Sequence, residues 1–279
     1  MSDPIRVCVL LGGETMPTWQ ANALERLLAD EPAAVTFAVV NADTSQRSLR
    51  ETVRRGIELR EWGAVGAMLA ARRRLRGPPP SQERIPIDDI DALRTAPQRR
   101  CEPISVDGWK QRLPDEVVDE IAASADVVVR FGFGVLVGRV LTATEYGVLS
   151  YHHGDLREYR GMPMGFWEFV HGRDAAGVTL QRLNETLDGG EIVAFERVEI
   201  GDAGRWSEVK SRLFDASESL LARGVRNLRR ESWEPTTPDE LGDLYTTPKG
   251  KPVLTYLART ARGMASFGPI EKRRDDPES

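Results

Sequence analysis

Cysteine and histidine are scarce in this sequence. Its 279 residues include two cysteines, Cys8 and Cys101, and three histidines. Both cysteines lie in apolar, strand-like runs, which indicates reduced, buried thiols rather than a disulfide framework. No Cys or His pair has the usual spacing of zinc ligands, so we expect no metal. His152 and His153 are adjacent, and neighbouring side chains on a strand point in opposite directions, which makes them poor joint ligands.

Long apolar runs and an excess of positive charge are also missing. No stretch is long or apolar enough to span a membrane, and the first residues, M-S-D-P-I-R, lack the pattern of a signal peptide. We therefore expect a cytoplasmic protein with no membrane partner. The net charge of -5 and the pI of about 5.5 argue against a nucleic-acid partner. The arginines at positions 72, 73, 74 and 76 are interpreted as the solvated C-terminal end of a surface helix.

Apolar runs and amphipathic stretches alternate along the chain. Residues 5–11, I-R-V-C-V-L-L, are typical of a strand buried in a parallel sheet, and an amphipathic stretch follows at residues 18–29. Further strands are predicted at residues 35–40, 102–106, 126–131, 147–152, 177–183 and 191–200. Further helices are predicted at residues 45–56, 61–75, 114–122, 165–171, 207–230 and 253–262. This alternation predicts an α/β fold with a doubly wound, mostly parallel sheet and a helical C-terminal extension.

Two parts are predicted along the chain. Residues 1–204 form the α/β domain, and residues 205–279 form a C-terminal helix and a polar tail. Residues 76–100 contain G-P-P-P and have weak periodicity, so we expect a surface insertion. The long helix and the tail could contact a second subunit, which keeps a homodimer open.

A histidine and a carboxylate mark the expected site. His152 follows an apolar run, and Asp188 lies in an L-D-G-G turn about thirty-five residues later, so the two could meet in a cleft. A structural histidine and a hairpin-turn aspartate are the alternatives. Gly12 and Gly13 follow the first predicted strand and could admit a phosphate or carboxylate, or simply form a tight turn.

The order of motifs from residue 126 to residue 193 resembles the folate-dependent formyltransferases, which act on glycinamide ribonucleotide, methionyl-tRNA or amino sugars. The resemblance is carried by S-Y-H at residues 150–152, Y-R-G at residues 159–161, and G-V-T-L-Q-R-L-N-E-T-L-D-G-G-E-I-V at residues 177–193. The segment D-V-V-V-R-F-G-F-G-V-L-V-G, residues 126–138, is similar to the part of these enzymes that lines the folate pocket.

The resemblance implies a Rossmann-like transferase of one-carbon metabolism, with 10-formyltetrahydrofolate as formyl donor and a small-molecule amine, such as an amino sugar or a nucleotide-linked amine, as acceptor. It implies His152 and Asp188 as catalytic residues, assisted by Ser150 and His153. The implied folate-binding residues are Phe131, Gly132, Phe133, Gly134, Val135, Val137, Asn184 and Leu187. The implied acceptor-binding residues are Gly12, Gly13, Asp155, Tyr159, Arg160 and Gly161.

Ser150 departs from the family pattern. It stands where the family has an asparagine that holds the formyl oxygen, and a serine hydroxyl is shorter and offers one donor. Three other functions therefore stay open. They are a 10-formyltetrahydrofolate hydrolase, a related acyl or carbamoyl transferase, and a folate or metabolite binder without catalysis.

Overall fold

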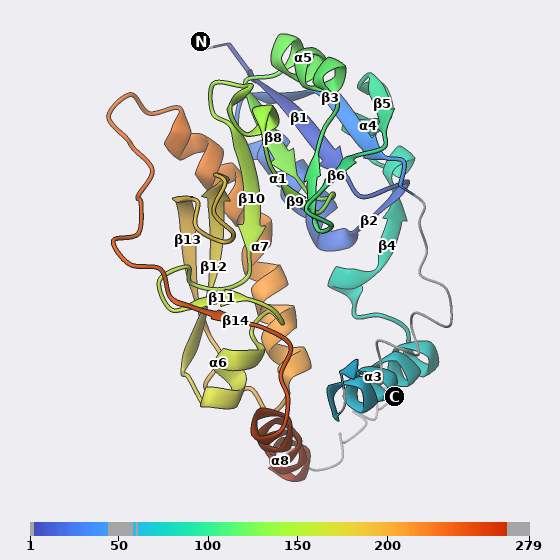
Figure 1. Cartoon of the computed structure of the whole chain (residues 1–279), viewed down its shortest axis with the longest axis vertical. Coiled ribbons are helices and arrows are strands. Elements are labelled where there is room, and N and C mark those ends of the chain that lie inside the picture. The colour runs from blue at the N-terminus through green and yellow to red at the C-terminus, as the bar shows by residue number, and fades with distance from the viewer. Residues whose placement is uncertain (1–2, 44–57, 60, 267–279) are drawn as a thin grey trace, which may run out of the picture.

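A seven-stranded sheet forms the centre of the molecule. The computed structural model describes residues 3–43, 58–59 and 61–266. The strand order is β13-β12-β10-β8-β1-β3-β5 (Figure 1). The bounds are β1 (Ile5–Leu11), β3 (Ala33–Asn41), β5 (Gln98–Cys101), β8 (Val127–Arg130), β10 (Val148–His152), β12 (Ala175–Arg182) and β13 (Glu191–Glu199). Strands from β10 to β5 are parallel, and β12 and β13 are antiparallel at one edge, which confirms the predicted fold class.

Helices cover both faces of the sheet. α1 (Thr18–Asp30), α4 (Asp91–Thr95) and α7 (Trp206–Leu228) pack on one face and α5 (Asp115–Ser124) on the other. The other helices, α3 (Glu61–Arg76), α6 (Phe166–His171) and α8 (Lys251–Ser266), pack on one another through aromatic rings. Alternate residues of β1 point to opposite faces, so Val7 and Val9 join the core with α1 and α7, whereas Cys8 and Leu10 join the core with α5. Burial on both faces explains why β1 is almost continuously apolar.

The segment expected as a surface insertion contributes to the sheet and to the core. Its C-terminal end forms β5, the edge strand that pairs with β3. Ile87, Ile90 and Leu93 are buried, because their spacing of three places them on one side of two short helical turns, η2 (Ile87–Asp89) and α4. The short elements before it are η1 (Pro80–Gln82) and β4 (Arg84–Pro86), which pairs with β2 (Thr15–Pro17).

The remaining strands are short and form two small sheets. One contains β6 (Ile104–Val106), β7 (Lys110–Arg112) and β9 (Val135–Leu136), the last of which is followed by η3 (Arg139–Thr142). The other pairs β11 (Tyr159–Gly161) in parallel with β14 (Asp243–Tyr245), which brings the C-terminal segment against the Y-R-G motif. The predicted helix at residues 45–56 lies outside the described residues.

The C-terminal helix α7 shares the main core. Leu213, Leu220, Leu221 and Val225 are fully buried and pack with residues of β12 and β13. With the buried Ser217 included, they recur every three or four residues, which places them on one face of the helix. Residues on both sides of position 204 thus share one core. The domain boundary placed there stays a prediction.

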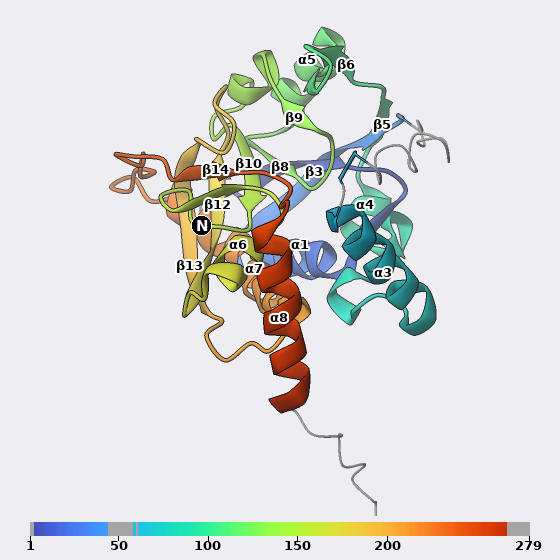
Figure 2. The ribbon, with the colours of Figure 1, turned by 60° about the horizontal axis from the view of Figure 1, so that its bottom comes forward.

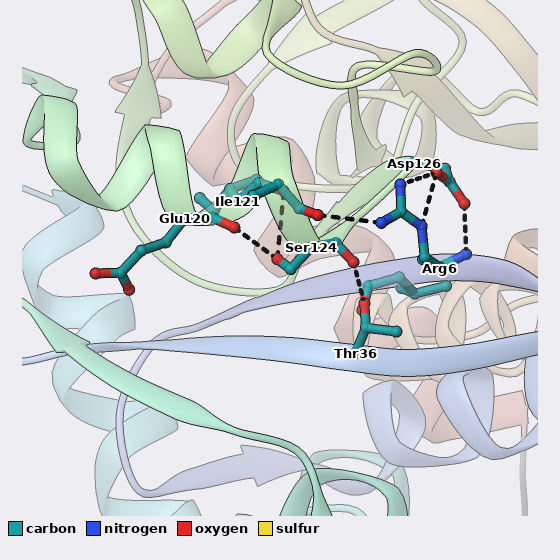
Figure 3. Close-up of polar contacts among 8 residues, drawn as sticks. Arg6, Thr36, Glu120, Ile121, Ser124 and Asp126 are labelled. Carbon is teal, nitrogen blue, oxygen red and sulfur yellow. Dashed lines mark hydrogen bonds and ion pairs between the residues drawn. The ribbon is translucent and has the colours of Figure 1, made fainter.

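A polar cluster joins three elements at the end of the sheet opposite the carboxyl ends of the parallel strands (Figure 3). The guanidinium of Arg6 donates to Asp126 Oδ1 from Nε at 3.0 Å and from Nη2 at 2.6 Å, and the Arg6 backbone N–H donates to Asp126 Oδ2 at 2.8 Å. Thr36 Oγ1 donates to the Ser124 carbonyl at 2.8 Å. These bonds connect β1 and β3 to the end of α5 and to the residue before β8.

Candidate active site

His152 and Asp188 meet at the end of β10. His152 is 7% exposed, and its Nδ1 lies 3.5 Å from Asp188 Oδ1. Its Nε2 lies 2.9 Å from the carbonyl oxygen of Tyr159. A carbonyl only accepts, so Nε2 carries a proton and donates it to Tyr159. Both ring nitrogens are therefore engaged, one with a carboxylate and one with the backbone.

The pKa shifts of His152 and Asp188 both favour their charged forms. Burial opposes protonation of His152, but the hydrogen bond and the charge of Asp188 outweigh it and raise the pKa of His152. Burial opposes ionisation of Asp188, but the hydrogen bond and the charge of His152 outweigh burial and lower the pKa of Asp188. Both shifts favour the charged forms, a protonated His152 beside an ionised Asp188.

Backbone geometry holds Asp188 in this position. Asp188 has a positive φ of 45°, which the turn requires and which few residues other than glycine adopt. The Gly161 N–H donates to Asp188 Oδ2 at 3.0 Å. On the other side of the turn, Asn184 Nδ2 donates to the Gly189 carbonyl at 2.8 Å, and the Gly190 N–H donates to Gln181 Oε1 at 3.0 Å. The L-D-G-G segment therefore bends so that the carboxylate faces β10.

Arg130 belongs to the site although no sequence motif points to it. Its Nη1 donates to Ser150 Oγ at 2.7 Å, its Nε to the Gly134 carbonyl at 3.1 Å, and its Nη2 to the Phe133 carbonyl at 3.3 Å. Burial lowers the pKa of Arg130, and the charge of Asp188 acts in the opposite direction. The available signal was a charged residue that ends the apolar run D-V-V-V.

A small polar cavity lies between these groups, with a volume of about 60 Å³. Its lining consists of Arg130, Val135, Leu136, Ser150, Tyr151, Gln181, Leu183, Asn184, Thr186, Leu187 and Asp188. This volume holds a few water molecules, whereas sites for drug-sized ligands occupy roughly 300–1,000 Å³. A wider hollow of about 700 Å³ shares Leu183 and Asn184 with it.

Three of the predicted folate-binding residues, Val135, Asn184 and Leu187, line the cavity. Phe131, Gly132 and Gly134 instead make contacts that position the loop after β8. The Phe131 ring stacks on Tyr151 at 6.2 Å between centroids, and the Gly134 N–H donates to Gln111 Oε1. A Cβ on Gly132 would come within 2.0 Å of the Gly12 nitrogen. The two glycine turns thus touch each other, because β1 and β8 are neighbours in the sheet.

His153 does not line the cavity. Its Nε2 lies 3.0 Å from Ser217 Oγ on α7, and Trp19 and Phe214 contact its ring edge-on at 5.3 and 5.1 Å. Burial lowers the pKa of His153 to about 3, and the neighbouring His152 adds to this. His153 is therefore neutral and belongs to the packing between β10 and α7.

The predicted acceptor-binding residues of the β11 region are occupied by partners within the chain. Asp155 accepts from Arg157 Nε at 2.7 Å. Arg160 donates from Nε to the Gly242 carbonyl at 2.7 Å and from Nη1 to the Leu187 carbonyl at 3.2 Å. These bonds connect β11, the Asp188 turn and the C-terminal segment.

Tyr159 and Gly161 also contact the C-terminal segment. The Tyr159 ring stacks on Tyr245 at 5.2 Å, and Tyr159 Oη lies 3.0 Å from His171 Nδ1. Gly161 has a φ of 88°, and a Cβ there would meet the Tyr245 carbonyl oxygen at 2.0 Å. The strand β14 can pair with β11 only because residue 161 lacks a side chain.

Neither a metal centre nor a membrane helix is found among residues 3–43, 58–59 and 61–266. No three His, Cys, Asp or Glu side chains gather there in a way that could hold a metal ion. No helix in these ranges has both the length and the apolar character needed to cross a membrane.

Comparison with known proteins identifies the family. A family model described as formyl transferase matches residues 81–225, just over half of the 279 residues. The chain therefore belongs to the formyl transferase family, which confirms the resemblance seen in the sequence. The change of the family's asparagine to Ser150 stays a prediction.

Curated relatives match the chain over part of their length. Methionyl-tRNA formyltransferase of Lachnospira eligens is 29% identical over 138 residues, which are 48% of this chain and 44% of that protein. The enzyme of the same name from Bacillus subtilis is 28% identical over 132 residues, 47% of this chain and 42% of that protein. The chain thus matches less than half the length of these relatives.

Solved structures share the fold. Glycinamide ribonucleotide transformylase 1 from Symbiobacterium toebii has a TM-score of 0.53 at 15% identity, covering 86% of this chain and 96% of that one. A formyltetrahydrofolate deformylase from Pseudomonas syringae has a TM-score of 0.55 at 16% identity, covering 85% and 67%. An N-formyltransferase from Helicobacter canadensis, in complex with folinic acid and dTDP-3-aminofucose, has a TM-score of 0.53 at 11% identity, covering 92% and 80%.

Proposed function

We propose that this protein transfers a formyl group from 10-formyltetrahydrofolate to the amine of a small molecule. The observation that carries the proposal is the buried His152–Asp188 pair beside a polar cavity, on the fold of a formyl-transferring family. A sugar-linked or nucleotide-linked amine suits the small-molecule neighbours on this fold better than tRNA suits an acidic chain that matches only part of the tRNA-modifying relatives.

The cavity suits the formyl end of such a donor. Arg130, Ser150 and Asp188 present donors and an acceptor to a space of about 60 Å³, which accommodates a carbonyl group but no bicyclic ring. The wider hollow beyond Asn184 has room for the rest of the donor, with its volume of about 700 Å³. The donor supplies an activated formyl carbon, and the protein supplies position and charge.

Arg130 and Ser150 are proposed to stabilise the oxyanion. As the amine nitrogen bonds to the formyl carbon, the carbonyl oxygen gains negative charge. A guanidinium N–H and a hydroxyl aimed at that oxygen replace the amide that Ser150 lacks. Protonated His152 adds a positive charge behind Asp188, and the Tyr159 carbonyl fixes the orientation of the imidazole.

Asp188 is proposed to carry the proton. The attacking amine passes a proton to the Asp188 carboxylate, which lines the cavity. The same proton is delivered to the donor nitrogen as its bond to the formyl carbon breaks, so the products are a formamide and tetrahydrofolate. Since His152 and Asp188 are buried together, removing either leaves the other without its partner.

Amine dependence of tetrahydrofolate release tests the proposal. A panel of amino sugars and nucleotide-linked amines is mixed with 10-formyltetrahydrofolate, and release is followed by absorbance. His152→Ala and Asp188→Asn should each lower kcat/KM by about 100-fold or more. Asp202→Asn is the control, because Asp202 is exposed and pairs with Arg212 on the surface. Undiminished turnover in both site variants would exclude the proposed site.

Hydrolysis of the donor is the second candidate. The cavity admits water but no bulky acceptor in its present form, which favours water as the nucleophile. Release of formate at the same rate with and without amines would assign hydrolysis. Release that saturates with one amine would assign transfer.

A further inference from the structure

A basic pocket lies outside the candidate active site, between α3, the residues around η1 and the first turns of α7. Its volume is about 470 Å³. Its lining consists of Leu69, Ala70, Arg72, Arg73, Arg76, Gly77, Pro78, Pro79, Gln82, Ser207 and Lys210. Figure 2 shows α3 beside the body of the protein, near the end where α8 leaves it.

Aromatic contacts fix α3 against the body. Trp62, in the first turn of α3, packs on Phe166, Trp206 and Tyr256 at 4.9, 5.8 and 6.2 Å between centroids. These rings come from α6, α7 and α8. The pocket between α3 and α7 is therefore bounded by elements that share a packed interface.

Four cations line the pocket, and none of the lining residues is acidic. Arg72, Arg73 and Arg76 come from α3, and Lys210 comes from α7. Within the part of the chain that the structure describes, no carboxylate lies at ion-pair distance from any of the four. Other arginines of this protein are paired, such as Arg139 with Asp119 at 2.7 Å and Arg212 with Asp202 at 2.6 Å.

Lys210 distinguishes this pocket from a solvated helix end. Its Nζ lies 4.2 Å from the centre of the Trp206 ring, so its stem is held in one place. Burial lowers the pKa of Lys210, and the nearby charge of Arg73 lowers it further. The sequence alone favoured a solvated arginine cluster on one helix. A lysine from a second helix that is held close to this cluster repels it, unless an anion lies between them.

We propose that this pocket binds the phosphate or diphosphate group of a small-molecule ligand. The volume lies within the range of small-molecule sites, roughly 300–1,000 Å³. Arginine side chains offer paired N–H donors to phosphate oxygens, and Lys210 offers a point charge. The Ser207 hydroxyl, one turn before Lys210 on α7, adds a neutral donor.

A phosphorylated acceptor of the proposed formyl transfer is one source of such a group. This assignment to the acceptor rests on the proposed function, whereas the binding of phosphate does not.

Binding of pyrophosphate to the protein alone tests the site. Trp206 lies against Lys210, so tryptophan fluorescence and calorimetry should both report saturable binding. Arg73→Gln and Lys210→Met should each raise the dissociation constant about tenfold or more, because each removes a charged hydrogen-bond donor. Arg74→Gln is the matched control, since Arg74 lies on the same helix but does not line the pocket.

The outcomes separate the two proposals. Absence of saturable binding at millimolar pyrophosphate, or equal weakening of binding by Arg74→Gln, would overturn the proposal that this pocket binds phosphate. Tighter binding of tRNA than of pyrophosphate, lost in the same variants, would overturn a small-molecule ligand in favour of RNA. His152→Ala should bind pyrophosphate normally, so failure of formyl transfer leaves this result intact. If transfer occurs, Lys210→Met should raise KM for a phosphorylated amine about tenfold with little change in kcat.

Discussion

Arg130 donates a hydrogen bond from Nη1 to Ser150 Oγ over 2.7 Å, across the cavity next to Asp188. The two residues come from neighbouring parallel strands, β8 and β10, and are register partners. A long cationic side chain thus approaches a short hydroxyl where the family resemblance implies a longer amide. The first prediction concerns this pair.

Arg130→Met should lower kcat/KM for formyl transfer by about 10- to 100-fold, the usual effect of removing a charged donor. Stability should fall by only about 1–2 kcal/mol, because methionine fills part of the volume while the carbonyls of Phe133 and Gly134 lose their donor. Steady-state kinetics and urea unfolding measure the two effects. A variant that keeps full activity would remove Arg130 from the proposed oxyanion site.

Ser150→Asn tests whether Arg130 compensates for the missing amide. In the wild-type background the larger side chain competes with the Arg130 guanidinium for the same cavity, so activity should fall. In the Arg130→Leu background the asparagine has room, and the double variant should be more active than the product of the single effects. A coupling of about 1 kcal/mol or more in this double-mutant cycle is expected. Additive effects would show that the two positions act independently.

The Asp188–His152 pair predicts a specific dependence of stability on pH. The pKa of His152 is raised above its ordinary 6.5, so its contribution is complete below that value and is lost as pH rises through the folded pKa. The pKa of Asp188 is lowered below 3.8, so its contribution is present above that value and is lost as pH falls through the folded pKa. The pair is therefore most stabilising between these two ordinary values.

Asp188→Asn should remove this contribution. The loss of unfolding free energy should be about 1–3 kcal/mol in the interval and should shrink at higher pH, where His152 is neutral in either protein. Thermal unfolding of both proteins over a pH series measures it. The exposed Asp202→Asn serves as control and should change stability little above pH of about 5. A loss that does not vary with pH would contradict the charged pair.

Gly154→Ala should damage the site through geometry alone. A Cβ at this position would come within 2.6 Å of both His152 Nε2 and the Tyr159 carbonyl oxygen, the two atoms of the hydrogen bond that orients the imidazole. We expect a loss of stability of about 1–3 kcal/mol and a larger proportional loss of activity. Gly66→Ala in α3 is the control, since nothing lies within 4 Å of its added Cβ, and it should gain up to about 1 kcal/mol. Similar effects of the two substitutions would argue against close packing at the histidine.

The sequence predicted those parts of the fold that have a local pattern. The strands β1, β3 and β8 are short, nearly continuous apolar runs bounded by polar or glycine residues, and α7 has a single apolar face with a helical period, so these local patterns identify them. The segment with Ile87, Ile90 and Leu93 was harder, because each helical turn there is too short to show a period. The edge strand β5, with the sequence Q-R-R-C, has three exposed polar residues and forms only because β3 lies beside it.

Long-range contacts also limited the prediction of the site. His152 and Asp188 were found through motif order, and the structure brings them to 3.5 Å. The pairing of β14 with β11 could not be predicted from three residues, D-L-Y, that carry no period and lie 84 residues away from their partners (243 minus 159). Arg130 was hidden for another reason. Its role follows from where its guanidinium ends, and the sequence specifies only the position of its backbone.

His153→Phe separates the two adjacent histidines. Because the pKa of His153 is lowered to about 3, the unfolded chain binds a proton at this residue as pH falls below about 6.5, while the folded protein does not. This difference should cost the wild type about 2 kcal/mol of stability near pH 5 relative to neutral pH, and phenylalanine should abolish that cost. The aromatic contacts with Trp19 and Phe214 are retained, and Ser217 Oγ keeps its bond to the Leu213 carbonyl at 2.7 Å. Formyl transfer should keep its pH profile, since residue 153 does not line the cavity. A loss of activity like that of His152→Ala, without a change in the stability profile, would instead place His153 in the catalytic machinery.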